Sequence, residues 1–262
     1  MKELFGSIIW KTAALIIFLF TGCAFIACKL KSEESYVLMI SLDGFRWDYP
    51  SIYNTPNLDQ IATEGVKAKR MYSSFPTNTF PNHYSMVTGL YPGHHGLINN
   101  AFFAPDLNMF YQMNDISIVE NPAFYSGEPM WVTAEKQGIK TAAFYWVGSE
   151  TPIEGIQPSY WKRYDESVDF STRIDTIVKW FGYPEYKRPK LINLYFEEPD
   201  ATGHTFGPVS EQTRSVVERL DSLLGTLRTK LSTLPIADKI NIIVESLVLR
   251  DRKSTRLNSS HT

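Results

Sequence analysis

Four short apolar runs, separated by segments with helical periodicity, constrain the fold of this chain more than any other feature. Such a run, bounded by turn residues, is consistent with a buried strand. Strands that alternate with helices form a mostly parallel sheet with helices on both faces. The sequence therefore predicts an α/β fold with strands at Tyr36–Leu42, Thr141–Trp146, Leu191–Phe196 and Ile240–Val244, and a further strand at Val66–Tyr72.

Helices are predicted between these strands from capping residues and apolar spacing. Thr55-Pro56 begins one helix and Gly65 ends it. The clearest helix runs from Ser210 to Ser232, where valine and leucine recur at intervals of three and four residues. Two more helices are predicted, over Pro129–Gln137 and Ser171–Trp180.

The composition is that of an ordinary globular protein, with 44% apolar residues and a formal net charge of −2. A nucleic-acid-binding domain would need a basic patch or stripe, so no nucleic-acid-binding surface is expected. Apart from its two ends, the chain has the length of one domain, which we place at residues 29–250.

Residues 1–28 are predicted to be an export signal. Lys2 and Lys11 give a positive start, and the uncharged apolar run that follows is shorter than the ~20 residues of a membrane-spanning helix. Cys23 and Cys28 each end a sequence that resembles a bacterial lipoprotein processing site. The expected location is the bacterial cell envelope, either in the periplasm or on a membrane through a lipid anchor. A retained signal anchor is the alternative.

The stretch Ser73–Asn100 is rich in Pro, Asn, Thr, His and Gly, and it interrupts the regular pattern. Within it, Thr79 precedes Phe-Pro-Asn, and Tyr84 and Val87 follow at helical spacing. Thr79 is therefore predicted at a helix N-terminus, where free backbone N–H groups favour an anion such as phosphate. Because a threonine hydroxyl is a weak nucleophile, it needs a base or a metal ion. The sequence contains no Gly-x-Ser-x-Gly elbow, so a metal ion is the simplest activator.

Candidate metal ligands follow two of the predicted strands. Asp43 comes directly after the first apolar run, and Asp200 and His204 come shortly after the run that ends at Phe196. Open α/β sheets place their chemistry at the carboxyl ends of strands. Carboxylate and imidazole together suit Zn²⁺ or a similar divalent ion.

Four segments carry a resemblance to a known family: SLDGFR (41–46), PTNTFPNHYSMVTGLYPGHHGLINN (76–100), WVGSE (146–150) and EEPDATGHTFGP (197–208). In this order they resemble the nucleotide pyrophosphatase/phosphodiesterase family, or type I phosphodiesterases, of the alkaline phosphatase superfamily. The resemblance implies an alkaline-phosphatase-like fold. It also implies hydrolysis of phosphodiester or pyrophosphate bonds, in nucleotides or related small-molecule substrates, with two zinc ions.

The resemblance assigns roles at the reacting centre. It implies that Thr79 is the nucleophile and that Asp43 and Thr79 bind one zinc ion. Asp200 and His204 match ligands of the other zinc ion. Asn100 matches the residue that holds a non-bridging phosphate oxygen.

Three further residues are implied to contact the substrate. Phe80 and Tyr164 match the aromatic pair that sandwiches a nucleobase. Asn78 stands where the family commonly has lysine. It offers a hydrogen bond to the substrate but no positive charge.

The resemblance stops after Val244, where the family continues into Ser-Asp-His-Gly and this chain reads Glu-Ser-Leu-Val. The missing Asp and His, and a later His, are zinc ligands in the family. Residues 251–262 look like the translation of a sequencing adapter. We therefore expect a C-terminally truncated fragment that lacks the remaining ligands and is inactive.

Each assigned residue also has a structural explanation. Asp43-Gly44 could form a turn and Thr79 could be an N-cap. Aromatic residues belong to the core by default. Three histidines match no ligand position of the family and are interpreted as structural or solvent-facing: His83, His94 and His95.

Two other functions stay open. One is a phosphomonoesterase of the same superfamily, and the other is a non-catalytic, truncated envelope protein. A sulfatase would need Cys or Ser as the precursor of formylglycine, so Thr79 excludes it. The sequence makes no prediction of the oligomeric state.

Overall fold

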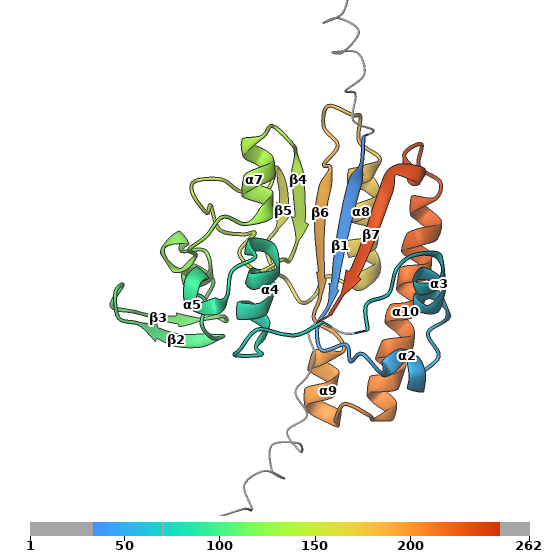
Figure 1. Cartoon of the computed structure of the whole chain (residues 1–262), viewed down its shortest axis with the longest axis horizontal. Coiled ribbons are helices and arrows are strands. Elements are labelled where there is room, and N and C mark those ends of the chain that lie inside the picture. Colours follow the sequence, from blue (N-terminus) through green and yellow to red (C-terminus); the bar gives the residue numbers. More distant parts are fainter. Residues whose placement is uncertain (1–33, 70, 247–262) are drawn as a thin grey trace, which may run out of the picture. The chain divides into compact units, whose positions relative to one another are not determined.

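Five parallel strands form the central sheet of the computed structural model, in the order β5-β4-β6-β1-β7 (Figure 1). The structure describes residues 34–69 and 71–246. The predicted export signal, both cysteines and the 251–262 tail lie outside them. The strands of this sheet are β1 (Tyr36–Leu42), β4 (Thr141–Phe144), β5 (Tyr160–Lys162), β6 (Leu191–Phe196) and β7 (Ile240–Glu245).

Helices connect these strands, as expected for parallel pairing. The longest begins at a serine N-cap, Ser210, whose side chain accepts a hydrogen bond from the N–H of Thr213. No helix of the described residues is long and apolar enough to cross a membrane. The helices are α2 (Tyr49–Ile52), α3 (Pro56–Glu64), α4 (Thr79–Thr88), α5 (Pro92–His95), α6 (Ile116–Val119), α7 (Met130–Lys136), α8 (Phe170–Phe181), α9 (Asp200–Phe206) and α10 (Glu211–Leu231), with 3₁₀ turns at Pro122–Phe124 and Ala237–Lys239.

Helices α4 and α7 cover one face of the sheet. Ser41 of β1 hydrogen-bonds to His83 of α4, and the amide of Asn193 in β6 contacts the sulfur of Met130 in α7. Because parallel neighbours in register point to the same side, this face carries the polar residues of the central strands.

Helix α8 covers the opposite face, and α10 packs against α8. Tyr36 meets Phe181 edge-on, and Phe196 meets Phe170 in the same way. Burial of one large apolar side chain stabilises a fold by roughly 1.5–3 kcal/mol. Apolar side chains therefore fill the space between the sheet and α8, whereas the face under α4 and α7 also buries the polar residues Ser41 and Asn193.

The strand predicted over Val66–Tyr72 is wrong. The structure has no strand in the described part of this segment, and Val66 and Tyr72 are 101% and 81% exposed. β-Branched and aromatic residues favour a strand only where a sheet can bury them, and the high exposure of Val66 and Tyr72 shows that no sheet covers these two side chains.

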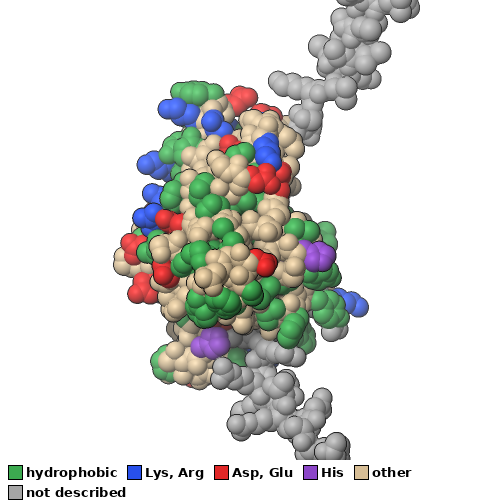
Figure 2. All heavy atoms as spheres, turned by 90° about the vertical axis from the view of Figure 1, so that its left-hand side faces the viewer, with side chains coloured by type: hydrophobic (Ala, Val, Ile, Leu, Met, Phe, Trp, Pro, Cys, Tyr) green, Lys and Arg blue, Asp and Glu red, His purple; other side chains and the backbone are tan. Residues whose placement is uncertain are grey.

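A two-stranded hairpin was not predicted. It consists of β2 (Ala101–Ala104) and β3 (Met109–Gln112), which pair antiparallel and stand apart from the main sheet (Figure 1). Phe103 and Phe110 on this hairpin are more than half exposed. Figure 2 views this side of the molecule and shows hydrophobic side chains gathered over it, with Lys and Arg along one edge.

Candidate active site

The carboxyl ends of β1 and β6 touch each other through a glycine. Gly44 follows Asp43 with a φ of +71°, and a Cβ at Gly44 would lie 2.7 Å from the Cα of Asp200. The N–H of Asp200 donates to the carbonyl of Asp43 at 2.9 Å. The absence of a side chain at Gly44 therefore lets the two strand ends, and with them Asp43 and Asp200, lie side by side.

Asp43 is buried, with 4% of its surface exposed. Burial raises the pKa of its carboxyl group to about 6, and hydrogen bonds from the hydroxyls of Tyr195 and Thr79 oppose this rise. The Tyr195 hydroxyl donates to Oδ2 of Asp43 at 2.8 Å. The influence of Thr79 on the pKa of Asp43 places the two residues of the predicted pair near each other.

Asp200 opens α9, and His204 lies one turn later. Nε2 of His204 stands 3.3 Å from Oδ2 of Asp200, and the His204 side chain is 62% exposed. Burial and the nearby charge of Asp43 raise the pKa of Asp200, while the charge of His204 lowers it. Asp43 and Asp200 are thus two neighbouring carboxyl groups with raised pKa values. A bound cation would compensate their negative charge.

Thr79 is the first residue of α4, as the sequence predicts, and Asn78 is its N-cap. The loop before it is held by Asn82, which is buried. The Asn82 amide donates to the carbonyls of Pro76 and Asn78 at 2.8 and 3.0 Å and accepts from the N–H of Ser74 at 2.7 Å. Asn82 thereby fixes the backbone that leads into Thr79.

Asn100 faces the same helix start. Its Oδ1 accepts a hydrogen bond from the N–H of Phe80 at 3.0 Å, which orients its amide group. The Nδ2 group of Asn78 donates to Asn99 Oδ1 at 2.5 Å, so Asn78 is tied to the turn that carries Asn100. Thr79, Asn78 and Asn100 are therefore brought together.

The predicted aromatic pair is not brought into ring contact within the described residues. Phe80 meets Tyr111 of the hairpin edge-on at 6.2 Å. Tyr164 follows β5, is 44% exposed and meets Tyr145 at 5.1 Å. Each ring has a packing partner of its own.

No group of three or more Asp, Glu, His or Cys side chains within residues 34–69 and 71–246 is placed to hold a metal ion. Catalytic zinc sites normally use three protein ligands. The donors present come in pairs, Asp43 with Thr79 and Asp200 with His204, and so fall short of a zinc site.

Sequence reasoning missed three residues of this region: Asn82, Tyr195 and Glu245. Glu245 is the register partner of Ser41, and burial raises the pKa of its carboxyl group to about 8. Both of its oxygens are buried, and the nearby Ser41 side chain opposes the rise in pKa. Position alone could have indicated Tyr195 and Glu245, because each lies at the carboxyl end of a predicted strand.

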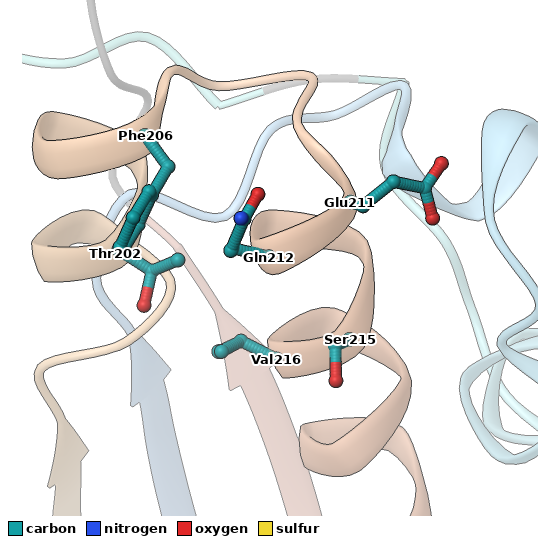
Figure 3. A pocket seen from close by; sticks show the side chains of 6 residues that line it. All are labelled: Thr202, Phe206, Glu211, Gln212, Ser215 and Val216. Carbon is teal, nitrogen blue, oxygen red and sulfur yellow. The ribbon is translucent and has the colours of Figure 1, made fainter.

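A shallow hollow of about 430 Å³ lies between α9 and α10 (Figure 3). Thr202 and Phe206 of α9 face Gln212 and Val216 of α10, whereas Glu211 points away. None of the predicted site residues lines this hollow, so the candidate site lies elsewhere, at the ends of β1 and β6.

Comparison with known families matches residues 37–246 to type I phosphodiesterase / nucleotide pyrophosphatase. The chain belongs to this family. The resemblance seen in the sequence is therefore confirmed. Similar curated proteins include venom phosphodiesterase CdcPDE of Crotalus durissus collilineatus, 39% identical over 83% of this chain and 26% of that protein. Another is human ectonucleotide pyrophosphatase/phosphodiesterase family member 1, 40% identical over 84% of this chain and 24% of that protein.

Solved structures of the family share the fold. An inactive variant of murine ectonucleotide pyrophosphatase / phosphodiesterase 5, in complex with AMP, is 35% identical with a TM-score of 0.78. The match covers 84% of this chain and 59% of that chain. The human protein of the same name matches with a TM-score of 0.75 and 35% identity, over 81% of this chain and 56% of that one. The predicted alkaline-phosphatase-like fold is confirmed, and the chain spans about a quarter of the curated relatives above.

Proposed function

We propose that the protein carrying this chain hydrolyses phosphodiester or pyrophosphate bonds of nucleotides, with Thr79 as the nucleophile. The observation that carries the proposal is the position of Thr79, at the first turn of α4 and near enough to buried Asp43 to lower the pKa of its carboxyl group. The complex of a murine relative with AMP supports a nucleotide as the substrate.

The chemistry follows from the groups around Thr79. The Thr79 oxygen forms a bond to phosphorus as its proton passes to the Asp43 carboxylate, and the bond from phosphorus to the leaving oxygen breaks while that oxygen takes up a proton from solvent. Water then attacks the phosphothreonine, the bond from phosphorus to the Thr79 oxygen breaks, and Thr79 regains its proton as the second product leaves.

Negative charge on the phosphoryl group needs hydrogen-bond donors. Because Oδ1 of Asn100 is engaged by the N–H of Phe80, its amide Nδ2 is left to donate to a phosphoryl oxygen. Asn78 offers a further amide donor beside it. The nucleobase of the substrate would stack on Phe80 and Tyr164. Stacking accepts any base, because every base has a π-face.

In the family, two zinc ions would supply Lewis-acid chemistry at this site. We infer that Asp43 and Thr79 would belong to one of them, and Asp200 and His204 to the other. The donors described in this chain make up two incomplete pairs. The remaining ligands would have to come from other parts of the family domain.

The test uses a protein that joins this sequence to the remainder of the family domain. Thr79→Ala should abolish hydrolysis of the nitrophenyl ester of a nucleoside monophosphate, and Thr79→Ser should keep part of it. Exposed Thr77, two residues earlier, provides the matched control as Thr77→Ala. Full activity of Thr79→Ala would contradict the proposal. A preference for a phosphate monoester over the diester would favour the phosphomonoesterase alternative.

We infer that the protein is exported and that Cys23 or Cys28 anchors it to the cell envelope. The names of the relatives, ectonucleotide and venom enzymes, support export. Metabolic labelling with palmitate should mark the protein in the membrane fraction, and substitution of the modified cysteine should release it. Unlabelled protein in the periplasmic fraction would contradict lipidation.

A further inference from the structure

His83 is a fully buried histidine in α4 to which the proposed chemistry gives no role. Its Nδ1 lies 2.8 Å from the carbonyl oxygen of Thr79, one turn earlier. Its Nε2 lies 2.8 Å from the hydroxyl of Ser41. Ser41 lies on β1, two residues before Asp43, which directly follows this strand. The imidazole ring therefore connects the strand that carries Asp43 to the helix start that carries Thr79.

The two contacts define the state of the ring. A carbonyl oxygen only accepts hydrogen bonds, so Nδ1 of His83 carries a hydrogen and donates it to Thr79. The ring is fully buried, and burial favours its neutral form. Nε2 then accepts from the Ser41 hydroxyl, and each bond has one donor and one acceptor.

Two aromatic rings hold the imidazole in place. Tyr195 meets it edge-on at 4.9 Å and Trp146 at 5.6 Å, and the Trp146 N–H donates to the His83 carbonyl at 3.1 Å. Tyr195 is the register partner of Ser41 and donates its own hydroxyl to Asp43. His83 is thus also connected to the Asp43 carboxylate through Tyr195, which contacts the imidazole ring and hydrogen-bonds to Asp43.

We propose that His83 is a positioning residue that fixes the Thr79 hydroxyl against Asp43, because its ring bonds both the Thr79 backbone and the strand that carries Asp43. This inference rests on the proposed function of Thr79. It predicts that a loss of the Nδ1 bond misplaces the nucleophile without weakening substrate binding.

Two isosteric variants separate the two ring nitrogens, in the protein with the complete family domain. In His83→Asn the amide nitrogen can take the place of Nδ1 and keep the bond to Thr79. In His83→Gln the amide reaches the place of Nε2 and keeps only the contact to Ser41. Because a misplacement of about 1 Å can cost roughly 100-fold in rate, kcat of His83→Gln should fall ~10–100-fold with KM within about 2-fold. His83→Asn should retain most of kcat.

Exposed His94 provides the matched control as His94→Gln. Thermal unfolding of all variants shows whether they fold. Equal kcat values for the Asn and Gln variants, or a loss that appears in KM, would overturn the inference. If His83→Asn does not fold, Ser41→Ala takes its place, because it also removes only the Nε2 contact and should retain most of kcat. A kcat for Ser41→Ala as low as that of His83→Gln overturns the inference. If His83→Gln does not fold, His83→Leu replaces it, and an unchanged kcat of His83→Leu overturns the inference. Full activity of Thr79→Ala would instead overturn the proposed function.

Discussion

At the scale of single residues, the site depends on positions that have no catalytic chemistry of their own. The dipeptide Asp43-Gly44 reads as a turn, and Gly44 does have a positive φ. The sequence alone could not show why glycine is required there. The reason is contact with Asp200, more than 150 residues later, and no local pattern encodes such a contact.

Gly44→Ala should therefore destabilise the protein more than a glycine with the same backbone conformation elsewhere. Gly138 is the matched control, because its φ is +75° and no atom of residues 34–69 or 71–246 lies within 4 Å of a Cβ there. A left-handed conformation costs an L-residue roughly 1–2 kcal/mol, and Gly44→Ala adds a clash with the Asp200 backbone. Urea unfolding should show a larger loss of unfolding free energy for Gly44→Ala. Equal losses would show that the close approach can relax.

At the scale of elements, the long apolar patterns were predictable and the short ones were not. The first strand and the strand Leu191–Phe196 are observed with the predicted bounds, and α10 lies within one residue of its prediction. The hairpin and β5 escaped prediction, because runs of three or four residues carry too little periodicity. The segment at 66–72 has strand-like residues but no sheet to bury them.

Helices α4 and α5 are joined by buried His95, and this contact should make stability depend on pH. Nε2 of His95 lies 2.9 Å from the Ser85 hydroxyl and 3.1 Å from the Pro81 carbonyl. Burial lowers the pKa of His95 from 6.5 to about 4. The unfolded chain therefore binds more protons between these values, and stability falls as the pH drops from about 6.5 to about 4.

The raised pKa values of Asp43 and Asp200 make stability rise as the pH falls, which is the opposite of the effect of His95. The measurement is therefore the difference in the pH dependence of unfolding free energy between the wild-type protein and His95→Gln. One such histidine contributes about 1.4 kcal/mol of unfolding free energy per pH unit. His95→Gln should remove this part of the slope in urea unfolding between pH 4 and 6.5. His94→Gln controls for the loss of an exposed histidine. The same slope in wild type and His95→Gln would show that His95 is not buried in a neutral state.

At the scale of the whole molecule, the sheet brings most of the predicted site to one edge, where the residues that the structure describes provide two pairs of candidate metal ligands. That Asp43 and Asp200 lie at the same edge of the sheet was predictable, because both follow the carboxyl ends of predicted parallel strands. That they touch depends on β1 and β6 being neighbours. Ser41 is paired with Tyr195 on one neighbouring strand and with Glu245 on the other. This pairing was not predictable, because local sequence patterns do not give the order of strands in a sheet.

The donor pairs lead to a prediction for the 262-residue chain itself. With only Asp43 and Thr79 on one side, and Asp200 and His204 on the other, zinc should bind weakly and phosphodiester hydrolysis should be absent. Loss of even the groups that support a ligand typically costs ~10–100-fold in affinity, and loss of a ligand costs more. The measurements are zinc content after dialysis, titration calorimetry with zinc, and hydrolysis of the nitrophenyl ester.

Asp43→Asn in the same chain tests whether any zinc that binds does so at the candidate site. If zinc binds weakly at Asp43, this variant should lower the affinity further, whereas binding elsewhere would leave the affinity unchanged. Addition of the remaining family domain should raise both zinc affinity and hydrolysis, because it would supply the missing ligands to donors that the sheet already holds in place. Stoichiometric zinc and full hydrolysis in the 262-residue chain would instead mean that two donors on each side are sufficient, which would contradict the prediction.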